Sequence, residues 1–211
     1  MKTRPSKILC IGRNYREHAA ELGNAVPERP IFFLKPPSAL IGPGESIVRP
    51  SQSALVHHEG ELGLVVGRTA RHVSVESALD FIEGYTLIND VTARDLQRAD
   101  GHFTRAKGFD TFCPVGPEVV PGLPDLACRV QCAVDGDVRQ DAPLSAMAFG
   151  LAEIVAYLSA HMTLEPGDLI ATGTPAGVGP LVAGNVVEVR LVEPDGRVRL
   201  VLSNPVVDFT A

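Results

Sequence analysis

Residues 57–66 read HHEGELGLVV, and this stretch combines the pattern of a β-strand with a pair of carboxylates. Side chains two apart on a strand share a face, so Glu59 and Glu61 are expected to point the same way while the apolar residues from Leu62 occupy the other face. Adjacent carboxylates repel, and burying them unpaired is costly. A hard divalent cation removes that conflict. The alternative is two solvated glutamates on an exposed strand.

Short apolar runs on both sides of this stretch predict further strands, separated by turns that the 20 Gly and 17 Pro residues provide. Predicted strands cover 7–11, 31–34, 59–66, 85–88, 115–120, 126–134, 138–140, 169–172, 186–192 and 197–202, with hairpin turns at 135–136 and 194–196. Predicted helices cover 14–22, 74–82 and 145–161, and 41–50 reads as a loop. We therefore expect a single domain over residues 1–211, of the α+β class, predominantly β, with a few short helices.

Composition excludes several classes of function. Hydrophobic residues make up 45% and charged residues 21%, which is typical of a globular protein. The net charge is -6 and no basic stripe is present, so we expect no nucleic-acid partner. No run approaches 18 apolar residues, so we expect no membrane span. The cysteines Cys10, Cys113, Cys128 and Cys132 form no C-x-x-C pair, which predicts buried free thiols and a cytoplasmic location.

Polar residues follow the predicted strand that ends near residue 89. Asp90 is placed there to act as a third carboxylate ligand, or alternatively to cap a helix within 92–97. Arg94, Gln97 and Lys107 come next. Arg and Lys can hold a carboxylate of an anionic ligand, although a charged surface loop is the simpler interpretation of such a run.

His18 and Glu21 lie three residues apart in the first predicted helix, so they share a face. A carboxylate beside a histidine can fix its tautomer and raise its basicity, which gives a candidate general base. The alternative is a surface histidine with an incidental neighbour.

Residues 171–179 read ATGTPAGVG. Glycines such as Gly173 let the backbone approach a ligand closely, and the hydroxyls of Thr172 and Thr174 can donate to a carboxylate. The stretch is not a nucleotide P-loop, because it has no Gly-Lys-Ser/Thr ending. A tight turn after a strand is the alternative.

The order of these motifs resembles the fumarylacetoacetate hydrolase family, and especially its small acylpyruvase members. The resemblance spans about residues 7–202. It rests on six motifs in this order: GRNY with the later His and Glu (12–21), FLKP (33–36), HEGEL (58–62), Asp-x-Thr-Ala-Arg-Asp-x-Gln (90–97), AKGFD (106–110) and TGTPAGVG (172–179).

The resemblance implies a mixed β-roll like the C-terminal domain of that family, with residues 1–30 forming a first strand and a lid helix, and a homodimer. It implies one Mg2+ or Mn2+, with Ca2+ as a further option, held by Glu59, Glu61 and Asp90. It makes His18, Glu21 and Lys107 the catalytic residues. Substrate contacts then fall to Arg94, Gln97, Gly173 and Thr174.

The implied activity is metal-dependent hydrolysis of a C–C bond in a 3-acylpyruvate-type 2-oxo acid, through a metal-stabilised pyruvate enolate. Residues 98–106 depart from the acylpyruvases, which carry a longer, Lys-rich insertion there, so the resemblance does not fix the substrate. Oxaloacetate decarboxylation or tautomerisation and 2-hydroxy-dienoate isomerisation use the same enolate and stay open. A non-catalytic oxo-acid binder and a β-rich interaction domain are the alternatives outside catalysis.

Overall fold

The computed structural model describes residues 4–21 and 23–210, and strands form most of its regular structure. A mixed seven-stranded sheet has the order β2-β1-β12-β6-β7-β9-β3. Its strands are β2 (Ile31–Lys35), β1 (Ile8–Gly12), β12 (Leu169–Ala171), β6 (Gly60–Val66), β7 (Ile82–Asn89), β9 (Cys113–Pro121) and β3 (Leu40–Ile41). The β1–β12 and β3–β9 pairs are parallel and the other pairs are antiparallel.

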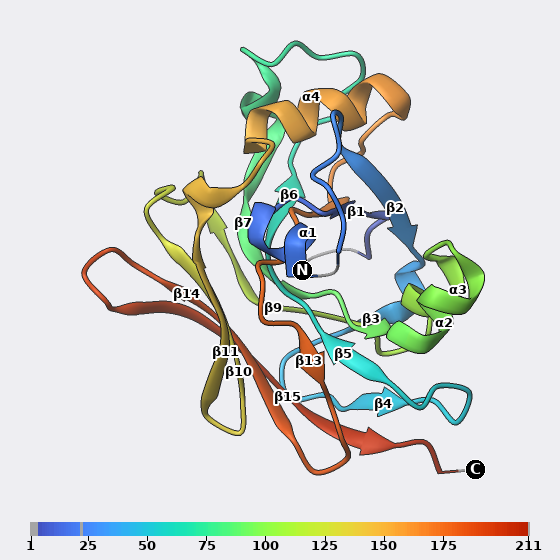
Figure 1. Cartoon of the computed structure of the whole chain (residues 1–211). Coiled ribbons are helices and arrows are strands. Elements are labelled where there is room, and N and C mark those ends of the chain that lie inside the picture. Colours follow the sequence, from blue (N-terminus) through green and yellow to red (C-terminus); the bar gives the residue numbers. More distant parts are fainter. Residues whose placement is uncertain (1–3, 22, 211) are drawn as a thin grey trace.

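Two smaller sheets complete the architecture. A five-stranded sheet contains β11 (Asp137–Pro143), β10 (Arg129–Val134), β14 (Val186–Val192), β15 (Val198–Asp208) and β4 (Ile47–Arg49), in that order. A three-stranded sheet contains β13 (Gly179–Pro180), β5 (Val56–His58) and β8 (Thr92–Ala93). The expected predominantly β, mixed β-roll fold is therefore confirmed (Figure 1).

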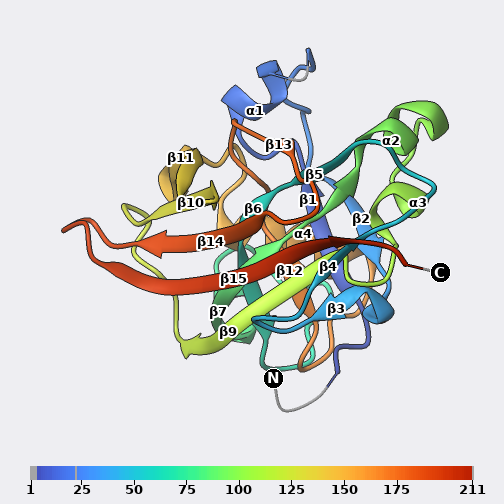
Figure 2. The same cartoon turned by 90° about the horizontal axis from the view of Figure 1, so that it is seen from below.

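Helices are few in the described ranges. They are α1 (Arg16–Glu21), α2 (Arg94–Asp100), α3 (Thr104–Lys107) and α4 (Leu151–His161), with 3-10 turns η1 (Pro37–Ala39), η2 (Ala78–Phe81) and η3 (Leu144–Ala146). Figure 2 shows α1 at one edge of the molecule, on the same side as α2. Leu22, where the first predicted helix ends, and residues 1–3 and 211 lie outside the described residues. No helix of the described ranges is long and apolar enough to cross a membrane.

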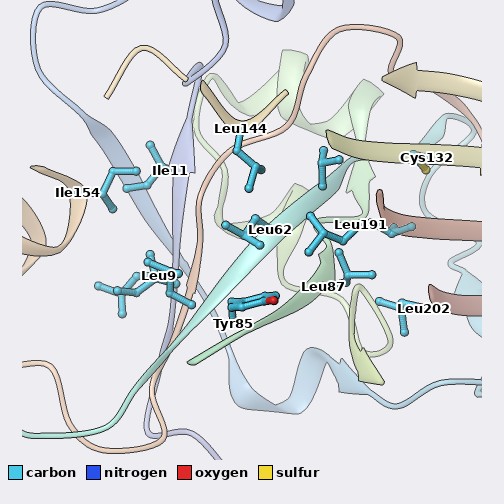
Figure 3. Close-up of a cluster of buried hydrophobic side chains, with 14 of the residues drawn as sticks. Leu9, Ile11, Leu62, Tyr85, Leu87, Cys132, Leu144, Ile154, Leu191 and Leu202 are labelled. Carbon is cyan, nitrogen blue, oxygen red and sulfur yellow. The ribbon is translucent and has the colours of Figure 1, made fainter. Parts of the chain in front are cut away.

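The main core lies between the seven-stranded and five-stranded sheets. Leu62 on β6 and Leu87 on β7 pack in one cluster with Leu191 on β14 and Leu202 on β15, and all four are buried (Figure 3). Side chains alternate between the two faces of a strand, and these four leucines lie on the inner faces of the two sheets. All four cysteines are buried free thiols, as predicted.

Three sequence predictions were wrong. Residues 41–50 contribute β3 and β4, because Leu40 and Ile47 find partners far along the chain, at Cys113 and Val206. The predicted helix 74–82 is only the short turn η2, because Ile82 pairs with Val66 in the sheet instead of continuing a helix.

The helix predicted at 145–161 begins later, at Leu151. Asn14 holds the preceding segment in a non-helical conformation. Its backbone carbonyl accepts from the N–H of Ala148, and its side-chain oxygen accepts from the N–H of Phe149. The same side chain donates to the carbonyl of Thr172 at 2.8 Å, so Asn14 ties the start of α4 to the glycine-rich loop.

Candidate metal and active site

Three buried carboxylates meet at one end of the β6–β7 pair. Glu61 is on β6, Glu59 precedes that strand, and Asp90 follows β7. Gly60 pairs with Asn89, and the N–H of Asp90 donates to the carbonyl of Glu59 at 2.8 Å, so the two strand ends lie side by side. One oxygen from each carboxylate lies within 4.8 Å of the others. Asp90 is not a helix cap, because α2 begins after Ala93.

Three buried cations surround these carboxylates. The ammonium of Lys107 donates to Glu59 and to Asp90, each at 2.6 Å. Lys35, on β2, donates to the other oxygen of Asp90 at 2.6 Å. The guanidinium of Arg94 forms an ion pair with Glu59. The site therefore contains three carboxylates and three cationic side chains inside the protein.

The two glutamates differ in electrostatic environment. Burial alone would raise the pKa of Glu59, but Lys107 and Arg94 outweigh it and hold that pKa well below its usual value. Burial raises the pKa of Glu61 well above its usual value, and the neighbouring carboxylates of Asp90 and Glu59 raise it further. Within the described ranges no ion pair reaches Glu61, whose carboxylate accepts from the backbone N–H of Gly173 at 2.7 Å.

This arrangement fits a divalent cation. All three side chains offer carboxylate oxygen, which Mg2+, Mn2+ and Ca2+ prefer. Glu61 is buried as an acid without a cationic partner in the described structure, and such a group is costly unless a charge compensates it. A divalent cation beside Glu61 would supply that charge.

Helix α1 brings the histidine and its partner to the same site. Nδ1 of His18 lies 3.2 Å from one carboxylate oxygen of Glu21. The other oxygen of Glu21 accepts from the backbone N–H of Gly177 at 3.0 Å. His18 is buried and lies close enough to affect the pKa of Glu59. The predicted pair is therefore formed and faces the carboxylates.

The loop after β12 requires glycine at two positions. Gly173 has a φ of 106°, and a Cβ there would lie 2.6 Å from the Cβ of Asn14. Gly177 has a φ of 98°, and a Cβ there would lie 1.9 Å from the carbonyl oxygen of Arg139. Glycine alone tolerates this combination of backbone conformation and close contact. The N–H of Gly173 donates to Glu61, and the N–H of Gly177 donates to Glu21.

The two threonine hydroxyls of the loop are already engaged. Thr172 donates to the carbonyl of Leu62 at 2.9 Å, and Thr174 donates to the carbonyl of Gly60 at 3.0 Å. Each hydroxyl proton is thus directed to the backbone of β6 in this structure. The role of Thr174 toward a substrate stays a prediction.

Gln140, on β11, joins the loop after β12 to β6. Its side-chain oxygen accepts from the N–H of Gly60 at 2.9 Å and faces Nδ1 of His58 at 3.1 Å. Its side-chain nitrogen donates to the hydroxyl of Thr174 and to the carbonyl of Pro175, each at 2.7 Å. The amide is fully buried. One side chain therefore fixes the spacing between the carboxylates and the loop.

A cavity of about 280 Å³ collects these groups. Of the predicted site residues, those that line it are His18, Glu59, Glu61, Asp90, Arg94, Gln97, Lys107 and Thr174. Glu21 and Gly173 do not line the cavity. Glu21 contacts His18, and the N–H of Gly173 donates to Glu61. The structure thus brings together the residues predicted from the sequence, and their individual roles stay predictions.

Sequence reasoning gave no role to Lys35 or Gln140. A lysine at the end of an apolar strand, at Lys35, is a usable signal, because a buried cation needs an acidic partner. Gln140 gave no such signal, since it lies on the other sheet. Its partners His58 and Thr174 are 82 and 34 residues away in sequence.

The chain belongs to the fumarylacetoacetate hydrolase family. The family model for the fumarylacetoacetate (FAA) hydrolase C-terminal domain matches residues 7–203. The mitochondrial oxaloacetate decarboxylase of Dictyostelium discoideum is 43% identical over 189 residues, which cover 86% of this chain and 87% of that protein.

Solved structures of the family share the fold. The 5-carboxymethyl-2-hydroxymuconate delta-isomerase of Mycobacterium smegmatis superposes with a TM-score of 0.89 at 45% identity, covering 99% of this chain and 81% of that one. The fumarylpyruvate hydrolase of Pseudomonas aeruginosa, in complex with Mn2+ and pyruvate, gives 0.86 at 33% identity, covering 97% and 91%. Relatives thus carry the names of a decarboxylase, an isomerase and a hydrolase.

Proposed function

We propose that this protein is a divalent-metal-dependent hydrolase that cleaves a C–C bond in a 3-acylpyruvate-type 2-oxo acid, such as acetylpyruvate or fumarylpyruvate. The observation that carries this proposal is the His18–Glu21 pair, in which His18 lines the same cavity as the three buried carboxylates. A general base beside a metal site is what delivery of a water molecule requires.

Glu59, Glu61 and Asp90 would hold the cation, which we propose to be Mg2+ or Mn2+. When bound, that cation supplies a Lewis acid for the 2-oxo acid group. Arg94 is suited to hold the substrate carboxylate, because its Nε is buried and has no hydrogen-bond partner among the described residues. Lys107 and Gln97 line the same wall and would orient the substrate.

His18 would act as the base. Its Nδ1 faces Glu21, so the proton belongs on Nδ1 and Nε2 can accept a proton from water. The resulting hydroxide attacks the distal carbonyl carbon, and the bond between that carbon and the methylene breaks. The electron pair passes to the pyruvate half as its enolate. The proton taken by His18 returns to the methylene carbon, which yields pyruvate and a carboxylic acid.

Oxaloacetate decarboxylation, with the related tautomerisation, is the second candidate. It is supported by the name of the Dictyostelium relative, which matches most of this chain. The enolate is the same in these reactions, and the outcome depends on whether His18 delivers water or only a proton. The dienoate isomerisation that the mycobacterial structure is named for belongs to the same group of alternatives.

Two properties complete the proposal. The family resemblance leads us to propose a homodimer, which sedimentation or light scattering would test. Four buried free thiols fit a reducing compartment, and on that ground we propose the cytoplasm.

The decisive experiment follows pyruvate release from acetylpyruvate, fumarylpyruvate and oxaloacetate, in Mg2+ and after chelation. We expect metal-dependent cleavage of an acylpyruvate well above turnover of oxaloacetate. Turnover of oxaloacetate alone would replace the hydrolase proposal with the second candidate. Undiminished acylpyruvate cleavage after complete chelation would overturn the role of the metal.

A further inference from the structure

The aromatic ring of Phe33 contacts the ammonium group of Lys107 in the wall of the cavity. Both residues line the cavity, and Phe33 lies on β2. Nζ of Lys107 lies over the ring, 5.0 Å from its centroid. A cation within about 6 Å of a ring centroid is attracted by the negative face of the ring. The ring is therefore close enough to influence where the ammonium lies.

Strand β2 directs two side chains toward the site. Phe33 and Lys35 are two residues apart on this strand, so they share a face, whereas Leu34 between them is exposed. Lys35 donates to the carboxylate of Asp90, and Phe33 contacts Lys107. One short strand thus supplies a cation for a carboxylate and an aromatic ring for a cation.

A second aromatic ring packs against the first. Phe103 also lines the cavity, and its ring centroid lies 4.8 Å from that of Phe33, with the two planes inclined by 44°. Aromatic pairs at this separation contribute more than the burial of their area. Phe103 directly precedes α3, the helix that ends at Lys107. The two rings therefore join β2 to the helix that carries the lysine.

A metal ion on the carboxylates would weaken the ion pairs of Lys107. The lysine donates to Glu59 and to Asp90, each at 2.6 Å, and both are candidate metal ligands. A divalent cation there would draw on the same negative charge and repel the ammonium. The ring does not enter this competition, because hard cations prefer oxygen, whereas the face of a ring attracts an ammonium. Since Lys107 is buried, an ammonium without a partner there would be costly.

From these contacts we propose that Phe33 is a positioning residue for Lys107. Its ring holds the ammonium by a cation–π contact and keeps it in the cavity wall when a divalent cation occupies the three carboxylates. The inference rests on the proposed function, in which those carboxylates hold the metal and Lys107 orients the substrate. It accounts for how a lysine stays beside a metal site whose ligands are also its own ion-pair partners.

The contact can be observed directly by NMR. The sequence contains four lysines, Lys2, Lys7, Lys35 and Lys107, so isotope labelling of the lysine ε-carbon gives few signals, and Lys107→Arg identifies the signal of Lys107. The face of an aromatic ring shifts nearby protons upfield. We expect the ε-protons of Lys107 to be shifted upfield in the metal-free full chain and to stay so in Mg2+.

Variants assign the shift to one ring. Phe33→Leu should abolish it and lower the affinity for oxalate in Mg2+, measured by calorimetry, about three- to tenfold. Phe33→Tyr should retain both properties, because the face of the ring is kept. Phe32→Leu is the matched control, since Phe32 is the half-buried neighbour on β2, packs edge-on against Tyr157 and does not line the cavity.

A second background separates the cation–π contact from packing. In Lys107→Met, which has no cation to hold, Phe33→Leu should change oxalate affinity by less than twofold. A loss as large as in the wild-type background would show that the ring acts through packing and overturn the inference. So would an upfield shift of Lys107 that persists in F33L, or one that disappears from the wild type when Mg2+ binds, and in these cases the proposed function stands. Failure of the wild type to bind Mg2+ at all would instead overturn the proposed function, and the inference with it.

Discussion

Glu21 accepts a hydrogen bond of 3.0 Å from the backbone N–H of Gly177, so the helix that carries His18 is tied to the loop after β12. Glu21→Gln keeps an acceptor for Gly177 but removes the charge beside His18. Because partners of this kind raise the basicity of a histidine, we expect kcat for acetylpyruvate to fall about 10- to 100-fold with little change in KM. Glu21→Ala removes both contacts and should raise KM as well. Identical kinetics in the two variants would show that the charge beside His18 matters and the tie to the loop does not.

His18→Ala should abolish most of the hydrolysis. Loss of a general base costs about 10²- to 10⁴-fold in rate. Binding of Mg2+ and of oxalate, an analogue of the pyruvate enolate, should persist, because His18 is not one of the three carboxylates. Steady-state kinetics and calorimetry would measure these effects, with His102→Ala as a control because that histidine is exposed. A fully active H18A would remove His18 from the mechanism.

Glu59 and Glu61 should respond differently to loss of charge. Glu59→Gln leaves Arg94 and Lys107 buried with one partner fewer, and breaking such a buried pair costs about 3–5 kcal/mol. Glu61→Gln removes a buried carboxylate that has no ion pair, so the metal-free protein should keep or gain thermal stability. Both variants should lose Mg2+ affinity. Thermal melts with and without EDTA would show the contrast, and an equal fall in Tm for both metal-free variants would contradict it.

Gln140→Leu should impair the site although Gln140 does not line the cavity. The change removes the donors to Thr174 and Pro175, which set the position of the loop whose Gly173 N–H holds Glu61. We expect kcat and Mg2+ affinity to fall about 10- to 100-fold. Gln140→Glu keeps the acceptor for Gly60 and should retain part of both. Gln131→Leu, on the neighbouring strand, is the matched control. If Q140L lowered Tm without changing kcat, Gln140 would be purely structural.

The sequence predicts the local part of this architecture well. Both hairpins follow from Asp-Gly turns between apolar runs, and β6 follows from its own alternation. Short strands such as β3 and β4 escape prediction, because two or three residues carry no periodic signal and their partners lie far along the chain. The late start of α4 depends on Asn14, which is remote in sequence from that helix.

The site, too, is only partly predictable from the sequence. The pairs Glu59 with Glu61 and His18 with Glu21 are recognisable from their spacing in the sequence, and the order of the motifs makes their combination specific to the family. Lys35 reaches Asp90 from a distant strand of the same sheet, and Gln140 reaches Gly60 from the other sheet, so their partners are defined only when the chain is folded. The engagement of Thr172 and Thr174 with backbone carbonyls of β6 likewise depends on tertiary contact.

Asp168 should make stability depend on pH in the acid range. Burial alone would raise its pKa, but hydrogen bonds from Lys7, Ser6 and the N–H of Glu165 outweigh it, and the pKa is lowered. A carboxylate with a lowered pKa stabilises the folded state above its unfolded pKa of about 3.9, and this contribution disappears as pH falls through the folded value. Asp168→Asn should therefore lower the free energy of unfolding at pH 7 by about 2 kcal/mol.

The difference between the wild type and Asp168→Asn should then shrink steadily below about pH 4, because protonation removes the same charge from the wild type. Urea unfolding of both proteins from pH 7 to pH 3 would measure it. Asp137→Asn is the control, since that carboxylate is exposed and its pair with Arg139 lies at the surface, where such pairs contribute little. A gap between the wild type and D168N that stayed constant with pH would place the effect in packing. A stability difference that grew as pH fell would be opposite in sign to the one expected from the lowered pKa of Asp168. The contacts of Asp168 with Lys7 and Ser6 would then no longer account for the anchoring of β1 beside β12.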